Sequence, residues 1–287
     1  LFIPIMTVSG AYTVNSSEMV GGLGIQSEHI AFISFVTSIG MAAFSPFFYS
    51  LVSVRRQKMM SLVGFSLLAV QSYICANTDS LFILALNSLI MGFVRQTLLM
   101  CNLFTLIKYG FGIEATRNVT PGNEPKDEAG WDALDTEKKA SQPIIYFFFM
   151  LLGQIGTWIT AWFAYNYQWQ MVYYAMLGAI LVALLITLLC MPYNPYPTKR
   201  MPLSFSKFGN VVVFCLMCCS FVYVTVYGKV YDWYDSPNIR WATVICVVSS
   251  LLFFYLEKTR RSPYFMLKAF KSRSIQGGIL LFIGLMI

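Results

Sequence analysis

One arginine lies near the middle of a long apolar stretch. Arg95 follows Phe93 and Val94 within residues 81–107. A charged side chain at the centre of a bilayer costs about 2.5–3.5 kcal/mol on insertion scales, so it usually faces a bundle interior or a water-filled cavity. Two interpretations follow. The guanidinium can bind an anionic group or a mobile counter-charge, or it can hydrogen-bond to helix carbonyls and polar side chains as a structural group.

Polar side chains accompany this arginine along the same stretch. Gln96 is adjacent to it. Asn87 lies eight residues before the arginine, and Asn102 lies seven residues after it. In a helix these spacings place Asn87, Arg95 and Asn102 on one face. Such a stripe can line a substrate path, or its members can hydrogen-bond to neighbouring helices. All four are candidate residues for substrate binding or coupling.

A second polar group ends the first apolar stretch. Tyr12, Thr13 and Asn15 follow a run of small residues at 9–11. Small and polar side chains near a helix end permit either tight packing or a cavity wall, and the sequence leaves both open.

The residues needed for metal binding, disulfide formation or catalysis are absent or scattered in the sequence. His29 is the only histidine, and the seven cysteines lie in apolar runs without the loop pairs of a zinc site or a disulfide framework. The 13 acidic residues all fall outside the predicted spans. Hydrolysis and group transfer usually need a carboxylate, histidine or cysteine in a defined cleft. There is also no phosphate-binding loop. The sequence therefore predicts a protein that is not an enzyme and has no metal or cofactor.

The chain as a whole is strongly apolar, which explains why the polar candidate residues lie among apolar ones. Hydrophobic residues make up 57% of the 287 residues and charged residues 11%, against about 25% charged in soluble domains. This predicts an all-α polytopic membrane protein with seven complete and two truncated transmembrane helices. Since the sequence begins and ends inside apolar runs and lacks an initiator Met, we expect a fragment of a longer protein. The predicted spans are 1–15, 29–52, 59–77, 81–107, 143–165, 170–191, 210–230, 239–256 and 275–287.

Basic residues alternate between successive loops. The basic loops are 53–58, 108–142, 192–209 and 257–274, and they hold most of the 20 basic residues. The intervening loops hold only Lys229 and Arg240. Because basic residues stay cytoplasmic during insertion, the basic loops and the N-terminus are predicted to be cytoplasmic. The net charge of +7 is then a topology signal, and no nucleic-acid partner is expected.

Aromatic residues gather where the spans at 143–165 and 170–191 meet. Amphipathic rings often sit at the headgroup level, so this cluster is interpreted as a belt at the membrane interface. Its members are Tyr165, Tyr167, Trp169, Tyr173 and Tyr174.

Three short patterns resemble motifs of the major facilitator superfamily. One set of residues, between 156 and 169, matches its antiporter motif. A second set, in the loop at 53–58, matches the basic end of its loop signature between the second and third helices. Gly92 matches the glycine of its Arg-x-x-Gln-Gly pattern, with Ser88 at the arginine position. All are candidate residues for conformational motifs. The antiporter set is Gly156, Ala161 and Trp169, the loop set is Arg55, Arg56 and Lys58, and Gly153 is a further candidate.

Beyond residue 191 the sequence is similar to the fourteen-spanner drug:proton antiporter branch. Residues 228–237 resemble the outer loop between its two extra central helices, and residues 257–273 resemble the cytoplasmic segment that follows. The resemblance implies a major facilitator-like bundle of six helices at 1–191, with a cytoplasmic loop at 108–142. It also implies two central helices at 192–256 and the start of a second bundle at 257–287.

The resemblance implies alternating access around a midplane site. It implies efflux of drug-like or amphipathic small molecules coupled to an ion gradient, usually of protons, across a bacterial inner membrane. We also expect a periplasmic or outer-membrane efflux partner. Glu18 is the carboxylate nearest the first span and the candidate for coupling. Two alternatives remain open: a transporter of an anionic metabolite that uses Arg95, and a non-transporting membrane protein such as a receptor, scaffold or membrane enzyme.

Overall fold

The computed structural model describes residues 3–7, 16–44, 47, 57–109, 147–148, 150–191, 205–259, 276–278 and 280. In these residues every regular element is a helix. Residues 3–7 and 150–166 are also helical. The other elements are α2 (Ser16–Leu23), α3 (Ser27–Ala43), α4 (Gln57–Asn77), α5 (Leu81–Tyr109), α7 (Trp169–Cys190), α8 (Phe205–Tyr227), the short 3-10 helix η3 (Trp233–Asp235) and α9 (Pro237–Thr259).

Five of the described helices are long and apolar enough to cross a membrane. Their outward sides are apolar as well. On α4, for example, Val63, Leu67, Val70 and Tyr73 are all exposed. A stripe of this kind is suited to lipid rather than water. Over the residues that the structure describes, the protein is therefore an all-helical membrane protein. The five helices are Gln57–Asn77, Leu81–Leu103, Trp169–Cys190, Phe208–Tyr227 and Pro237–Thr259.

Each of these five helices coincides with a predicted span. The span predicted at 29–52 is described as the 17-residue α3, and residues 150–166 cover most of the span predicted at 143–165. The described parts of the spans at 1–15 and 275–287 are helical. The total of seven complete and two truncated spans stays a prediction. The sequence did not predict α2, which lies in an expected loop.

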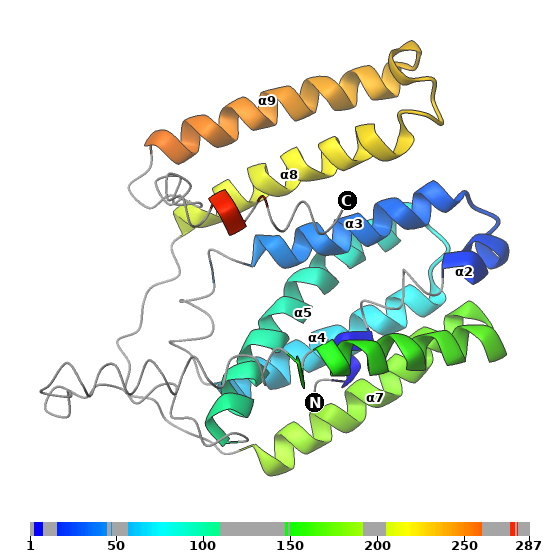
Figure 1. Ribbon diagram of the computed structural model, residues 1–287, viewed down its shortest axis with the longest axis vertical. Helices are drawn as coiled ribbons and strands as arrows, with labels where there is room; N and C mark the ends of the chain where they lie inside the picture. Colours follow the sequence, from blue (N-terminus) through cyan, green and yellow to red (C-terminus); the bar gives the residue numbers. More distant parts are fainter. Residues whose placement is uncertain are drawn as a thin grey trace, which may run out of the picture. The chain divides into compact units, whose positions relative to one another are not determined.

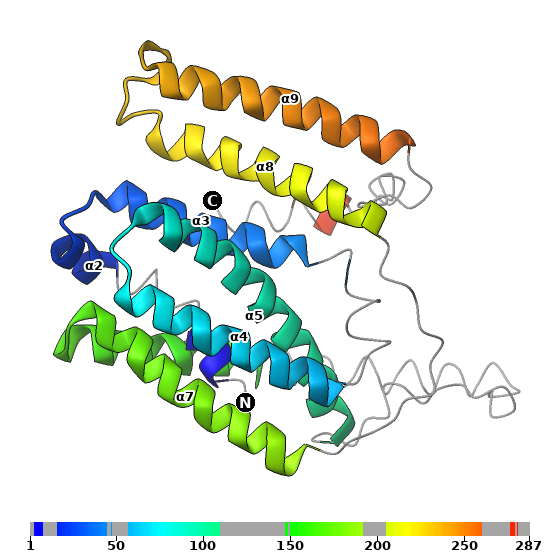
Figure 2. The same ribbon diagram turned by 180° about the vertical axis from the view of Figure 1, so that it is seen from behind.

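The chain divides into two compact units, Leu1–Leu203 and Ser204–Ile287. In the first unit, α5 contacts both α3 and α4, and both ribbon views show it crossing between them (Figure 1, Figure 2). α4 also packs against α7, while the short α2 contacts α3 and α7. The finer division at residues 191 and 256 remains a prediction.

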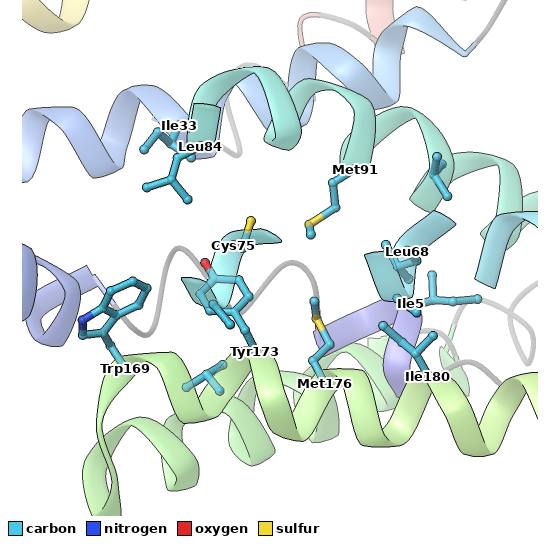
Figure 3. Packing of buried hydrophobic residues seen from close by; sticks show 14 of the residues in the cluster. Ile5, Ile33, Leu68, Cys75, Leu84, Met91, Trp169, Tyr173, Met176 and Ile180 are labelled. Atoms are coloured by element: carbon cyan, nitrogen blue, oxygen red, sulfur yellow. The ribbon is translucent and has the colours of Figure 1, made fainter. Parts of the chain in front are cut away.

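The core of the first unit lies where α4, α5 and α7 meet the segment at 3–7. Figure 3 shows Tyr173, Met176 and Ile180 of α7 pointing toward this interior. Ser72 of α4 donates from Oγ to the backbone oxygen of Tyr173 at 3.2 Å. Apolar packing and one interhelical hydrogen bond thus hold α4 and α7 together.

The interfacial belt is wrong for two of its five residues. Trp169 is 4% exposed and Tyr173 is fully buried. A Cβ placed on Gly22 would lie 2.5 Å from Cδ1 of Trp169, so the glycine lets α2 lie directly against the indole. Tyr173 directs its hydroxyl at the sulfur of Met19, 3.8 Å away. The unpredicted helix α2 covers both rings. Tyr165, Tyr167 and Tyr174 are exposed.

The second unit contains the hairpin of α8 and α9. Its helices pack through Phe214 and Phe253, whose ring centroids are 5.8 Å apart. At the tip, Arg240 donates from Nη2 to the backbone oxygen of Asp235 at 3.1 Å. The sequence interpretation placed every acidic residue outside the spans, and this is wrong for Glu257. Helix α9 continues through Thr259, and Glu257 is buried within it.

Candidate functional site

Arg95 is buried on α5, with 8% of its surface exposed. Its Nε donates a hydrogen bond to the backbone oxygen of Ile5 at 3.0 Å. Its Nη1 donates to the sulfur of Met41 on α3 at 3.1 Å. One guanidinium therefore joins α5 to two other elements, which matches the expectation that a membrane arginine faces a bundle interior.

Glycines bring these elements close enough for the short bonds. A Cβ on Gly92 of α5 would lie 2.0 Å from the backbone oxygen of Thr37, and a Cβ on Gly40 of α3 would lie 2.0 Å from that of Leu89. The two helices thus touch backbone to backbone at a reciprocal pair of glycines. Arg95 follows Gly92 by three residues, and Met41 follows Gly40 by one.

A third glycine holds the segment at 3–7 in place. A Cβ on Gly156 would lie 3.0 Å from Cβ of Met6 and 3.2 Å from the backbone nitrogen of Thr7. The helix at 150–166 therefore supports the segment that offers the Ile5 carbonyl to Arg95. Gly156 was predicted as part of a conformational motif, and its observed contact is tight helix packing.

The charge of Arg95 meets only neutral acceptors here. A carbonyl oxygen and a thioether sulfur carry no formal charge, and no carboxylate in the described part of the chain forms an ion pair with this arginine. The guanidinium has five N–H donors, and Nη2 makes no hydrogen bond with the described residues. The site can therefore still accept an anionic group.

The other polar residues of α5 serve different contacts. Asn87 is buried and donates from Nδ2 to the backbone oxygen of Gln71 at 2.9 Å and to the sulfur of Cys75 at 3.0 Å. Asn102 donates from Nδ2 to the backbone oxygen of Leu98 in its own helix at 2.8 Å. The predicted stripe is thus divided: Asn87 faces α4, whereas Arg95 faces α3 and residues 3–7. Gln96 is half-buried.

The remaining candidates do not gather at Arg95. Glu18 is exposed on α2. Lys58 lies at the start of α4 and donates from Nζ to the carbonyl of Leu188 at 2.8 Å, near the C-terminal end of α7, where a cation is favoured. Ala161 is half-buried, and a Cβ on Gly153 would meet nothing within 4 Å.

Five candidates lie outside the described residues. They are Tyr12, Thr13, Asn15, Arg55 and Arg56. Three described residues of the site were missed by the sequence interpretation, namely Ile5, Gly40 and Met41. A glycine within an apolar span was the one available signal. A backbone carbonyl and a methionine sulfur leave no pattern in a sequence.

Within the described residues, no group of three or more His, Cys, Asp or Glu side chains can hold a metal ion. The chemistry of the site is that of a fixed positive charge among neutral groups. Comparison of the sequence with protein-family models and with curated proteins finds no match.

Proposed function

We propose that the protein is a secondary active transporter of the major facilitator type, working by alternating access. The observation that carries the proposal is Arg95, a buried arginine in a membrane-spanning helix whose two hydrogen bonds go to neutral groups. Intramembrane arginines are rare, almost always face a bundle interior or a water-filled cavity, and mark substrate or ion pathways. In this proposal the chain catalyses no reaction and needs no cofactor.

The proposed substrate is a drug-like or amphipathic small molecule, exported in exchange for an ion, usually a proton. Its apolar part would pack against the bundle interior, and a polar or anionic group would receive the remaining guanidinium donors. Glu18 is the carboxylate proposed for coupling. The membrane is proposed to be a bacterial inner membrane, with the N-terminus in the cytoplasm and a periplasmic or outer-membrane efflux partner.

A second candidate function is transport of an anionic metabolite. The specific observation in its favour is that no described carboxylate compensates the charge of Arg95. A buried cation without a counter-ion is costly. A substrate anion would remove that cost on binding, so an anionic substrate gains more from this site than a cationic drug does.

The decisive experiment compares Arg95→Ala and Arg95→Lys with wild type in reconstituted vesicles of the full-length protein. We expect Arg95→Ala to lower the transport rate at least tenfold, with unchanged membrane insertion. Arg95→Lys keeps the charge but loses the planar fork, so its rate should be intermediate. Arg240→Ala, which removes an exposed arginine at the tip of the α8–α9 hairpin, is the matched control and should transport at the wild-type rate.

Wild-type transport by Arg95→Ala would remove the basis of the proposal. Proton flux measured during substrate addition separates the two candidates. An efflux antiporter moves protons against the direction of the substrate, whereas an anion symporter moves both in the same direction.

A further inference from the structure

The contact between α4 and α5 is a seam of buried side chains spaced three or four residues apart. Such spacing keeps one face of each helix toward its partner. On α4 the seam comprises Ser61, Gly64, Leu68, Gln71 and Cys75, and on α5 it comprises Asn87, Met91, Val94, Leu98 and Asn102; all ten residues are buried.

Two contacts fix the register of this seam. Asn87 bonds to the backbone of Gln71, and a Cβ on Gly64 would lie 2.7 Å from Cδ2 of Leu98. As the chain advances along α5, its partners on α4 move backward, so the two helices are antiparallel. Figure 2 shows the short connection between them.

This register brings Ser61 and Asn102 to the same level. Ser61 lies three residues before Gly64, and Asn102 lies four residues after Leu98. Both steps are about one helical turn, and in an antiparallel pair both lead toward the same end. Residues one turn apart share a helix face. Ser61 and Asn102 therefore face each other across the seam, one turn beyond the contact of Gly64 with Leu98.

Both residues carry a buried polar atom without a partner. Ser61 is fully buried and Asn102 is 1% exposed. The hydroxyl oxygen of Ser61 and the Oδ1 of Asn102 make no hydrogen bond with the described residues. The amide nitrogen of Asn102 is already committed to its own helix. Buried polar groups are nearly always satisfied, by protein or by ordered water.

We propose that Ser61 and Asn102 bind one buried water molecule between α4 and α5. The water would donate one hydrogen bond to Oδ1 of Asn102. It would form a second hydrogen bond with the hydroxyl of Ser61, which can donate or accept. The facing register supplies two partners to one molecule, which is the minimum a buried water needs. This inference stands independently of the proposed transport function.

The chemistry of the seam favours water over a cation. Neither α4 nor α5 contains an acidic residue, and two neutral oxygens are fewer than the six to eight that a hard cation such as calcium takes. Arg95 lies two turns away on α5 and repels cations. Leu68, Met91 and Val94 are buried between this level and the polar level of Gln71 and Asn87.

Radiolytic footprinting of the full-length protein in lipid nanodiscs tests the proposal directly. Hydroxyl radicals formed from a bound water oxidise side chains beside it even where bulk solvent is excluded. Cys101 is fully buried and adjacent to Asn102, whereas Met91 is fully buried in the apolar centre of the seam. We expect the oxidation rate at Cys101 to fall at least tenfold from wild type to Asn102→Leu, while the rate at Met91 stays unchanged.

An unchanged Cys101 rate in Asn102→Leu would overturn the proposal. Ser61→Ala provides a second measurement if the leucine variant folds poorly. One shared water predicts that Ser61→Ala and Asn102→Leu each lower the thermal midpoint, and that the double variant falls little further.

If no water is present, Ser61 and Asn102 are two unpaired buried groups. Each substitution would then raise the thermal midpoint, and the two increases would add. The last measurement is the thermal midpoint in the presence of sodium. A midpoint that rises with sodium in the wild type but not in Asn102→Leu would show a cation site instead and overturn the water. Neither readout requires transport, so failure of the Arg95 experiment leaves this test intact.

Discussion

The two sides of α5 are packed in different ways. Toward α3 the contact is made by backbone, with Gly40 and Gly92 each lying against a carbonyl of the other helix. Toward α4 the contact is made by side chains that interdigitate along a repeating seam. A backbone contact has no rotamers with which to adjust, whereas a side-chain seam does. The α3 side therefore fixes the position of α5 more strictly.

This difference bears on the candidate site. Arg95 and Met41 both lie within one turn of the glycine pair, on opposite helices. The short distance between Nη1 and the sulfur therefore depends on how closely the two backbones approach. In contrast, Asn87 and Asn102 belong to the side-chain seam, where a small shift can be absorbed. We infer that the rigid contact positions the charged group and the adjustable contact does not.

The largest expected effect is at the backbone contact. In Gly92→Ala the new Cβ would lie 2.0 Å from the carbonyl oxygen of Thr37, so the helices must separate. We expect the free energy of unfolding to fall by about 3 kcal/mol, at the upper end of typical overpacking costs. Denaturant titration in micelles measures it. Loss of transport should accompany the loss of stability, because Arg95 moves with its helix.

Gly153→Ala is the matched control for that substitution. It lies in another described helix, and its Cβ would meet nothing within 4 Å. Alanine is favoured over glycine in a helix by about 1 kcal/mol, so stability should stay constant or rise slightly. If Gly92→Ala behaves like Gly153→Ala, the backbone contact between α3 and α5 is not as close as described.

A smaller effect is expected on the opposite side of α5. In Gly64→Ala the new Cβ would meet the flexible end of Leu98 at 2.7 Å, which can change its rotamer. The expected cost is about 1 kcal/mol. In a Leu98→Ala background the same change should cost nothing, because the atom it meets is gone. Comparing the two backgrounds by denaturant titration measures the coupling.

The proposed difference between the two sides of α5 is contradicted if Leu98→Ala does not remove the stability cost of Gly64→Ala. No side-chain truncation should relieve Gly92→Ala, since its obstacle is a carbonyl oxygen. A matching rescue at both glycines would show that the two sides of α5 are packed alike.

Several features of the fold could be predicted from the sequence, for physical reasons. The five long helices follow from apolar runs of the length needed to cross a bilayer. The helix α2 could not be predicted, since eight residues carry too little periodic signal. Its Met19 is fully buried, so tertiary packing rather than local propensity holds it.

The site was predictable only in part. Arg95 was identifiable because a charge is rare in an apolar span. Its partners were not, because Ile5 contributes only a backbone oxygen from 90 residues away. The burial of Trp169 and Tyr173 was also missed. Helix α7 is apolar on nearly all sides, so its pattern does not tell which aromatic rings face protein.

The smallest expected effect concerns Asn87, and it decides between the two interpretations of the polar stripe. Asn87→Leu removes hydrogen bonds to the Gln71 carbonyl and the Cys75 sulfur. Interhelical hydrogen bonds in membranes contribute about 0.6 kcal/mol on average. A structural role therefore predicts a loss of that order by denaturant titration, with wild-type transport. If Asn87→Leu instead abolishes transport while stability is unchanged, Asn87 lines the substrate path together with Arg95, and the adjustable side of α5 carries function as well.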